Sequence, residues 1–244
     1  MTLLTIDIGN TMTKLSVFED ERAVYCVAGK GLGIEAVEAL LTYHTVDGIA
    51  YCCVGEDGGS LPGKLREIGL PMVALGAETP LPLEINYSSR ASLGTDRVAA
   101  AVGAVDGSQS ALVVDAGTAV TADIVSRGCF MGGNISPGLA LRFRSLHAYT
   151  SRLPMVEAAG ELTSFGRSTE TAIRDGVVNG LVWELQGAYR AARNMVPEID
   201  RLVLCGGDSD FLAPMLADLE IPVMTDHDAV GRGLVRIFNY NFNR

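Results

Sequence analysis

Two acid-bearing turns carry the residue types that bind phosphate groups and cations. Asp7 precedes Gly9 at the end of an apolar run, and Asp115 precedes Gly117 in the same way. Glycine lets a backbone approach a ligand closely, and an aspartate at a strand end can hold Mg²⁺ directly or through water. One such turn is more often a plain hairpin than a site. Two of them, in matching positions of a repeat, favour a nucleotide-binding cleft.

The same turns offer hydroxyl groups and one ammonium group. The hydroxyls belong to Thr11, Thr13, Thr118 and Thr121, and each can donate to or accept from a phosphate oxygen. Lys14 follows the first turn directly. Its ammonium group either reaches a phosphate or is solvated at a strand edge, and the sequence favours neither alternative.

A third acid lies in Gly94-Thr95-Asp96-Arg97, just before an Ala- and Val-rich segment. An aspartate there could take a proton from a substrate hydroxyl, while Arg97 and nearby N–H groups bind an anion. The alternative is structural, because Thr95 or Asp96 could simply be the N-cap of the helix that follows. Two further clusters suit either a ligand or only a tight turn, namely Gly132-Gly133-Asn134-Ile135-Ser136-Pro137-Gly138 and Cys205-Gly206-Gly207-Asp208.

The elements that must position these residues follow from the hydrophobic pattern, which alternates between short apolar runs and helical spacing. In the first half we expect strands at Leu3–Ile8, Lys14–Glu19, Val24–Val27, Gly48–Val54 and Pro71–Leu75, and helices at Glu35–Tyr43, Leu61–Ile68 and Asp96–Val105. In the second half we expect strands at Ala111–Asp115, Val120–Val125, Cys129–Gly133, Arg201–Leu204 and Pro222–Met224, and helices at Leu139–Ala148, Thr169–Met195, Phe211–Leu219 and Ala229–Phe238. Ser168 is a suitable N-cap for the long helix.

An internal repeat relates the two halves. Ile6-Asp7-Ile8-Gly9-Asn10 superimposes on Val114-Asp115-Ala116-Gly117-Thr118, and each copy is followed by a second strand. Three strands followed by helix–strand units, twice over, predict two related α/β domains with a central cleft, which is a usual place for a ligand. The Gly- and Ser-containing stretch Asp106–Ser110 predicts a boundary that divides the chain into residues 1–108 and 109–244.

The composition indicates a globular protein that acts on something small. The 244 residues include 29 Asp and Glu against 19 Lys and Arg, which gives a formal charge of −10. Nucleic-acid backbones require concentrated Lys and Arg, so we expect no nucleic-acid partner. No apolar run reaches the roughly 18 residues that span a bilayer, so we expect no membrane partner. The start lacks the basic segment of a signal peptide and the five cysteines form no C-x-x-C pair, which favours the reducing cytoplasm.

Taken in order along the chain, these motifs resemble those of type III pantothenate kinases, bacterial enzymes of the first step of coenzyme A synthesis. The matching pieces are Asp7–Thr11, Gly94–Arg97, Asp115–Thr121, Gly132–Gly138, Leu153-Pro154, Ser168–Gly176 and Leu204–Gly207. One departure is Thr95, where the family usually has alanine. The resemblance implies a fold of duplicated ribonuclease H-like domains, of the acetate-and-sugar-kinase/Hsp70/actin type, and a homodimer.

The resemblance also implies roles for individual residues. ATP would be bound by Asp7, Ile8, Gly9, Asn10, Thr11, Met12, Thr13, Lys14 and Thr118. Pantothenate would be bound by Tyr87, Gly94, Thr95, Asp96, Arg97 and Thr169, with Asp96 as the catalytic base. Asp115 would bind a monovalent cation, K⁺ or NH₄⁺. The structural alternatives are a core tyrosine for Tyr87 and a helix cap for Thr169.

The expected reaction is in-line transfer of the ATP γ-phosphate to the primary hydroxyl of pantothenate, with Mg²⁺ near Asp7. Two other functions remain open from the sequence. One is a kinase of the same fold that acts on a sugar or an acetate-like acid, and the other is a non-catalytic regulator that uses the cleft as a sensor. For the homodimer, the candidate interface is the Thr169–Met195 helix, which carries Trp183 and Tyr189.

Overall fold

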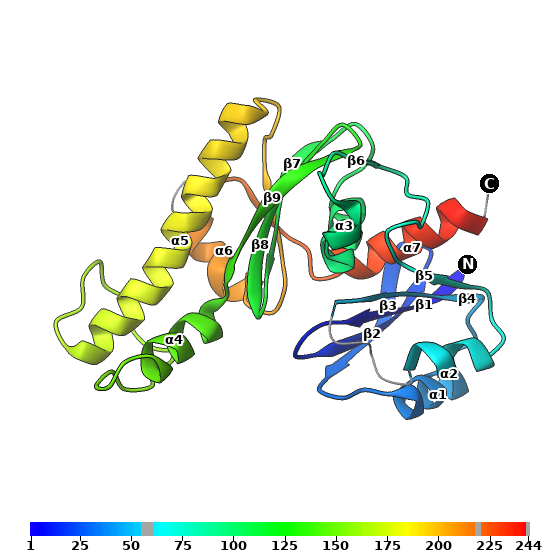
Figure 1. The fold of residues 1–244 in the computed structure, drawn as a ribbon, viewed down its shortest axis with the longest axis horizontal. Coiled ribbons are helices and arrows are strands. Elements are labelled where there is room, and N and C mark those ends of the chain that lie inside the picture. Colours follow the sequence, from blue (N-terminus) through cyan, green and yellow to red (C-terminus); the bar gives the residue numbers. More distant parts are fainter. Residues whose placement is uncertain (55–60, 218–220, 243–244) are drawn as a thin grey trace. The chain divides into compact units, whose positions relative to one another are not determined.

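The computed structural model describes residues 1–54, 61–217 and 221–242, and within them two β-sheets carry the helices (Figure 1). The chain packs into two compact units. The first comprises Met1–Gln109, Arg127–Gly132 and Asp228–Arg244, and the second comprises Ser110–Ser126 and Gly133–His227. The predicted division into domains 1–108 and 109–244 stays a prediction. The packing places two later segments, Arg127–Gly132 and Asp228–Arg244, in the same compact unit as the first 109 residues.

The first unit is built on a five-stranded sheet in the order β3-β2-β1-β4-β5. Its strands are β1 (Thr2–Ile8), β2 (Thr13–Glu19), β3 (Arg22–Gly29), β4 (Gly48–Cys53) and β5 (Met72–Ala74). Its helices are α1 (Ile34–Tyr43), α2 (Leu61–Glu67), α3 (Thr95–Ala104) and α7 (Ala229–Phe242). A short 3₁₀ turn, η1 (Arg90–Ser92), precedes α3.

Both faces of β1 are covered, which explains its nearly continuous apolar sequence. Because side chains alternate along a strand, Leu4 and Ile6 face one side and pack in a cluster with α1 and α2. On the other side lies α7, where Gly231 approaches the ring of Phe18 so closely that an added Cβ would lie 2.6 Å from it. Figure 1 shows α1 and α2 on one side of this sheet and α7 on the other.

Helices α3 and α7 cross with their backbones in contact. A Cβ added at Gly103 would lie 1.8 Å from the carbonyl oxygen of Ala229, and one added at Gly233 would lie 1.8 Å from that of Ala99. Only glycine lacks the atom that would collide, so both positions require it.

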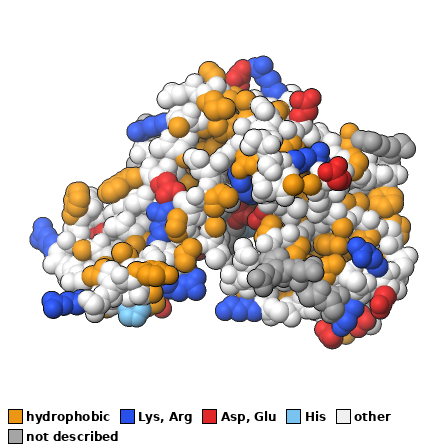
Figure 2. Space-filling view, in the orientation of Figure 1, with side chains coloured by type: hydrophobic (Ala, Val, Ile, Leu, Met, Phe, Trp, Pro, Cys, Tyr) orange, Lys and Arg blue, Asp and Glu red, His pale blue; other side chains and the backbone are white. Residues whose placement is uncertain are grey.

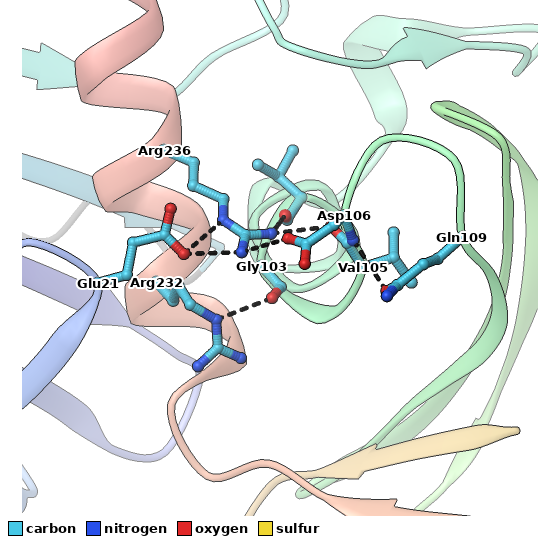
Figure 3. A network of polar contacts seen from close by, with 8 residues as sticks. Glu21, Gly103, Val105, Asp106, Gln109, Arg232 and Arg236 are labelled. Carbon is cyan, nitrogen blue, oxygen red and sulfur yellow. Dashed lines mark hydrogen bonds and ion pairs between the residues drawn. The ribbon is translucent and has the colours of Figure 1, made fainter.

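Two arginines of α7 hold the carboxyl-terminal end of α3 (Figure 3). Arg232 donates from Nε to the carbonyl of Gly103 at 3.0 Å, and Arg236 donates from Nη1 to the carbonyls of Val102 and Val105 at 3.0 and 2.8 Å. The last carbonyls of a helix have no partner within the helix, and cations stabilise that end. The same Arg236 forms ion pairs with Glu21 at 2.7 Å and Asp106 at 2.6 Å.

The second sheet has the order β11-β10-β7-β8-β9-β6. Its strands are β6 (Glu84–Ile85), β7 (Ser110–Ala116), β8 (Ala119–Ser126), β9 (Cys129–Pro137), β10 (Leu202–Cys205) and β11 (Val223–Thr225). The helices of the second unit are α4 (Leu139–Ala148), α5 (Thr169–Met195) and α6 (Ser209–Ala217). Without β6, this order repeats that of the first sheet strand for strand, which confirms the internal repeat and the duplicated α/β fold class.

The predicted strands and helices are present, with ends that differ by a few residues. Both β6 and η1 were missed, and β9 extends to Pro137, four residues beyond the expected end. The predicted end of α6, Leu219, lies outside the described residues. Ser168 caps α5 as expected, since its side chain accepts from the backbone N–H of Thr171.

On the face drawn in Figure 2, lysine and arginine side chains are scattered among acidic ones rather than gathered in a single stripe. Among the described residues, no helix combines the length and the apolar character needed to cross a membrane.

The contact of α3 with α7 makes a stability prediction. Gly103→Ala should lower the free energy of unfolding by at least about 2–3 kcal/mol, because its methyl group collides with the backbone of α7. Gly63→Ala is the matched control, since Gly63 lies in helix α2 of the same unit with open space around its missing Cβ. That variant should be neutral or up to about 1 kcal/mol more stable. Urea denaturation measures both, and equal stabilities would contradict the crossing.

Candidate active site

Asp7 is the last residue but one of strand β1 and lies between two partners that fix its position. In the antiparallel pair with β2 it lies opposite Lys14, and in the parallel pair with β4 it lies opposite Cys52. The turn that follows is closed by a hydrogen bond of 3.0 Å from the N–H of Gly9 to the carbonyl of Met12. Asn10, Thr11 and Met12 are exposed at its tip, whereas Thr13 is buried. The predicted turn is thus a hairpin whose tip is open to solvent.

The half-buried carboxyl of Asp7 is electrostatically unusual. Burial, together with the nearby charge of Asp96, raises its pKa from the ordinary value near 3.8 to about 6. The thiol of Cys52, which donates to Oδ1 at 3.4 Å, and the charge of Lys14 oppose that rise in pKa. A carboxylate that is poorly solvated gains more than an exposed one from a bound cation, so this group fits a site for Mg²⁺.

Lys14 has a partner of its own in the first unit. Its Nζ lies 3.7 Å from Oδ1 of Asp228, the residue just before α7, and both side chains are partly exposed. The ion pair is compatible with either of the roles that the sequence left open for Lys14.

The first turn of α3 places the third acid. Gly94 is the N-cap residue, which corrects the expectation that Thr95 or Asp96 would occupy that position. The carboxylate of Asp96 folds back instead, and its Oδ1 accepts from the N–H of Arg97 at 2.8 Å. A Cβ at Gly94 would lie 2.6 Å from that oxygen, so the glycine leaves room for the carboxylate.

Asp96 also has the electrostatics of a proton acceptor. Burial raises its pKa, and the hydrogen bond from the N–H of Arg97 and the charge of Arg97 oppose the rise. A general base works best when its pKa is close to the working pH, and burial shifts that of Asp96 in this direction.

The hydroxyl of Thr95 is used by neither the helix nor Asp96. It donates to the carbonyl of Cys53, the last residue of β4, at 3.2 Å. The start of α3 is therefore joined to the strand that pairs with β1.

Arg97 is buried, and its guanidinium lies over two aromatic rings. The distance from its Cζ to the ring centroid is 5.9 Å for Tyr87 and 5.7 Å for Phe130. The two rings meet edge to face with their centroids 6.1 Å apart. Such contacts between a cation and aromatic rings are attractive. Tyr87 thus has a packing role, while its predicted contact with substrate stays a prediction.

In the second unit, Asp115 occupies the position that Asp7 has in the first. It lies opposite Thr121 in the pair with β8 and opposite Cys205 in the pair with β10. Gly206 adopts a φ of +89°, and a Cβ there would lie 2.4 Å from Oδ1 of Asp115. The glycine therefore leaves the carboxylate a place at the sheet end, where oxygen ligands suit a cation. Asp208 follows closely, and burial raises its pKa.

The remaining predicted residues of the second unit are exposed. Thr118 lies at the tip of the turn after β7, where its carbonyl accepts from the N–H of Gly138 at 3.0 Å. Thr169 is the first residue of α5, and the cap of that helix is Ser168. The structural alternative for Thr169, a helix cap, is therefore wrong.

The structure brings Asp7, Asp96 and Arg97 together in the first unit, and it adds residues that the sequence interpretation missed. Cys52 was not among the predicted site residues, yet its thiol contacts Asp7. Its place opposite Asp7 follows from the parallel pairing of β1 with β4, so a correct strand alignment could have found it. Phe130 had no signal in the sequence. Among the described residues, no group of three His, Cys, Asp or Glu side chains could hold a metal ion.

Comparison with known proteins identifies the family. A family model described as type III pantothenate kinase matches residues 3–191. The chain belongs to the type III pantothenate kinase family. A type III pantothenate kinase of Bacteroides fragilis is 37% identical over 99% of both chains. One of Phocaeicola vulgatus is 34% identical over 98% of both chains.

Solved structures agree on the fold of this type III pantothenate kinase family member. A Campylobacter jejuni protein, provisionally assigned to the Baf family of transcriptional activators, has a TM-score of 0.67 at 24% identity and covers 99% of this chain and 100% of its own. A ROK family glucokinase from Streptomyces griseus has a TM-score of 0.51 at 12% identity and covers 98% of this chain and 99% of its own. At such identities the likeness shows the fold alone, which is of the acetate-and-sugar-kinase/Hsp70/actin type.

The pKa of Asp7 predicts how stability depends on pH. The folded protein binds this proton more tightly than the unfolded chain does, so this group's contribution to stability falls as the pH rises from about 4 to about 6. Asp7→Asn should therefore raise the free energy of unfolding at pH 7.5 by about 1–2 kcal/mol, and hardly at all at pH 4.

Urea denaturation at the two pH values checks this expectation. Asp200→Asn is the control, because the neighbouring Arg201 lowers the pKa of that carboxyl and its loss should not stabilise the protein at pH 7.5. The raised pKa of Asp7 is contradicted if Asp7→Asn is no more stable than the unmodified protein at pH 7.5.

Proposed function

We propose that this chain transfers the γ-phosphate of ATP to the primary hydroxyl of pantothenate, giving 4'-phosphopantothenate in the first step of coenzyme A synthesis. The observation that carries the proposal is Asp96, a half-buried carboxylate with a raised pKa at the start of α3, close enough to Asp7 for their charges to interact. Membership of the family supports the choice of substrate.

Asp96 acts as the base in this proposal. Its carboxylate orients the hydroxyl of pantothenate and accepts the proton as the oxygen attacks the γ-phosphate. The N–H of Arg97 holds Oδ1, which leaves Oδ2 for the substrate. Phosphoryl transfer needs little covalent help from a protein, so placing the hydroxyl and removing its proton is a large part of what the protein can contribute.

The turn from Asp7 to Lys14 binds the phosphates of ATP. Its exposed tip offers backbone N–H groups and the hydroxyl of Thr11, and Thr118 offers a hydroxyl on the turn of the second unit. Asp7 would hold Mg²⁺, directly or through water, and the ion would supply charge neutralisation at the phosphates. With two half-buried acids in the same unit, a bound polyanion requires such a cation.

The pantothenate contacts are assigned by position. Gly94, Thr95 and Arg97 surround Asp96 at the start of α3, and Tyr87 packs beneath the guanidinium of Arg97. Thr169 is a further contact, since its side chain is exposed at the start of α5.

Asp115 binds K⁺ or NH₄⁺ in this proposal. The glycine beside its carboxylate and the nearby Asp208 support a cation at this end of the sheet.

We further propose that the enzyme is a cytoplasmic homodimer. Helix α5 supports the dimer, because Trp183 is half exposed on it, although Tyr189 is buried within the unit.

The role of Asp96 makes the first functional prediction. Asp96→Asn should lower kcat by about 10²–10⁴-fold, because the amide cannot accept the proton. The measurement is a coupled ATP assay with pantothenate beside a panel of other hydroxylated acceptors. Glu78→Gln, an exposed acid of the same unit, controls for the change in charge. An Asp96→Asn enzyme with an unchanged melting temperature and near-normal turnover would remove the base assignment, and equal rates with other acceptors would remove the substrate.

The proposed role of Asp115 as a cation ligand makes the second functional prediction. Activity should rise with added K⁺ or NH₄⁺, and Asp115→Asn should raise the half-saturating cation concentration by at least about 10-fold, because a charged ligand is lost. Choline chloride at the same ionic strength is the control. Activity that is indifferent to both cations would exclude the site.

A further inference from the structure

The last two residues of β4 contact both elements that carry the acids of the first unit. Cys52 is fully buried and donates its thiol proton to Oδ1 of Asp7 at 3.4 Å. Cys53 accepts at its carbonyl from the hydroxyl of Thr95 at 3.2 Å. One short piece of strand is thus hydrogen-bonded to the end of β1 and to the first turn of α3.

The bond from Thr95 is unusual for a residue at a helix start. The first N–H groups of a helix lack partners, and a threonine hydroxyl there commonly serves them. Here the N-cap is Gly94, which has no side chain, and the carboxylate of Asp96 accepts from one of these N–H groups, that of Arg97. The hydroxyl of Thr95 instead reaches outside the helix, to a residue 42 positions earlier in the chain.

This bond lies at the amino-terminal end of α3, where the guanidinium of Arg97 also packs over the rings of Tyr87 and Phe130. The contact of Gly103 with α7 and the arginine bonds act on the other end. The segment just before α3, from residue 75 to residue 94, is mostly irregular and contains only the short β6 and η1. The hydrogen bond of Thr95 to Cys53 ties the first turn of α3 to strand β4, and this turn carries Asp96 directly after Thr95.

We propose that Thr95 is a positioning residue of phosphoryl transfer: its hydroxyl, bonded to the carbonyl of Cys53, fixes Asp96 relative to the strand that supports Asp7. This inference rests on the proposed role of Asp96 as the base. Because the hydroxyl proton of Thr95 is already donated to Cys53, the proposed contact of Thr95 with pantothenate uses its backbone rather than its hydroxyl. A small displacement of a catalytic group is costly to the rate, so the bond acts on turnover more than on binding.

Three substitutions at this position separate the hydroxyl from the methyl group. Thr95→Val keeps the shape and removes the hydroxyl, Thr95→Ala removes both groups, and Thr95→Ser keeps the hydroxyl. We expect the valine and alanine variants to lose about 5- to 50-fold in kcat while KM for pantothenate and ATP changes less than about two-fold. The serine variant should retain kcat within about two-fold of the unmodified enzyme.

The matched control is Thr42→Val in α1. The hydroxyl of Thr42 also donates to a backbone carbonyl, that of Glu38, at 3.0 Å, but far from the acids along the chain. Its kcat should be unchanged. Melting temperatures of all variants accompany the kinetics, so that a loss of folded protein is not counted as a loss of turnover.

A double-variant cycle decides whether Thr95 acts through Asp96. In an Asp96→Asn background, Thr95→Val should lower kcat no further, because the group that it positions is already disabled. The inference is overturned by any of three results: multiplicative losses in the double variant, a serine variant as slow as the valine one, or a rise in KM for pantothenate at unchanged kcat. If Asp96→Asn alone turns over normally, the base assignment fails instead, which distinguishes the two failures.

Discussion

Two helix backbones in contact determine the geometry of the acid-bearing unit. At the crossing of α3 with α7, Gly103 and Gly233 each lie where any side-chain carbon would overlap a carbonyl of the other helix. Glycine within a helix costs about 0.5–1 kcal/mol relative to alanine, and here the close packing and the arginine bonds from Arg232 and Arg236 offset that cost. Because α7 also covers β1, the crossing places α3 on the same scaffold as the strand that carries Asp7.

The acids at the ends of these elements give the net charge of −10 a more specific meaning. Asp7 and Asp96 are both half-buried, and burial raises the pKa of each. Such groups would repel a polyphosphate ligand if they stood alone. The arrangement therefore suits a reaction in which cations accompany the nucleotide, and the modest number of lysines and arginines need not limit phosphate binding.

Much of this fold was predictable because local signals and the repeat agree. Apolar runs that end in Asp-x-Gly identify β1 and β7, and Ser168 marks the start of α5. The contacts around Asp96 were not predictable in this way. Thr95 is hydrogen-bonded to Cys53, 42 residues earlier in the chain. The ring of Phe130 meets that of Tyr87 where β6 pairs with β9, and β6 has only two residues, too few to show a hydrophobic pattern. Such contacts depend on the register of distant strands, which one-dimensional periodicity does not specify.

Helix α7 is made of residues 229–242, yet it belongs to the unit that begins with the first strand. During synthesis, β1 emerges from the ribosome long before the helix that covers it, and the whole second unit is translated in between. The second unit can therefore fold while the chain is still growing, whereas the face of β1 that includes Leu3 and the neighbouring Phe18 stays uncovered until residues 229–242 have been translated. The sequence order thus imposes a delay on the unit that carries Asp96, during which exposed apolar surface is open to chaperones or to aggregation.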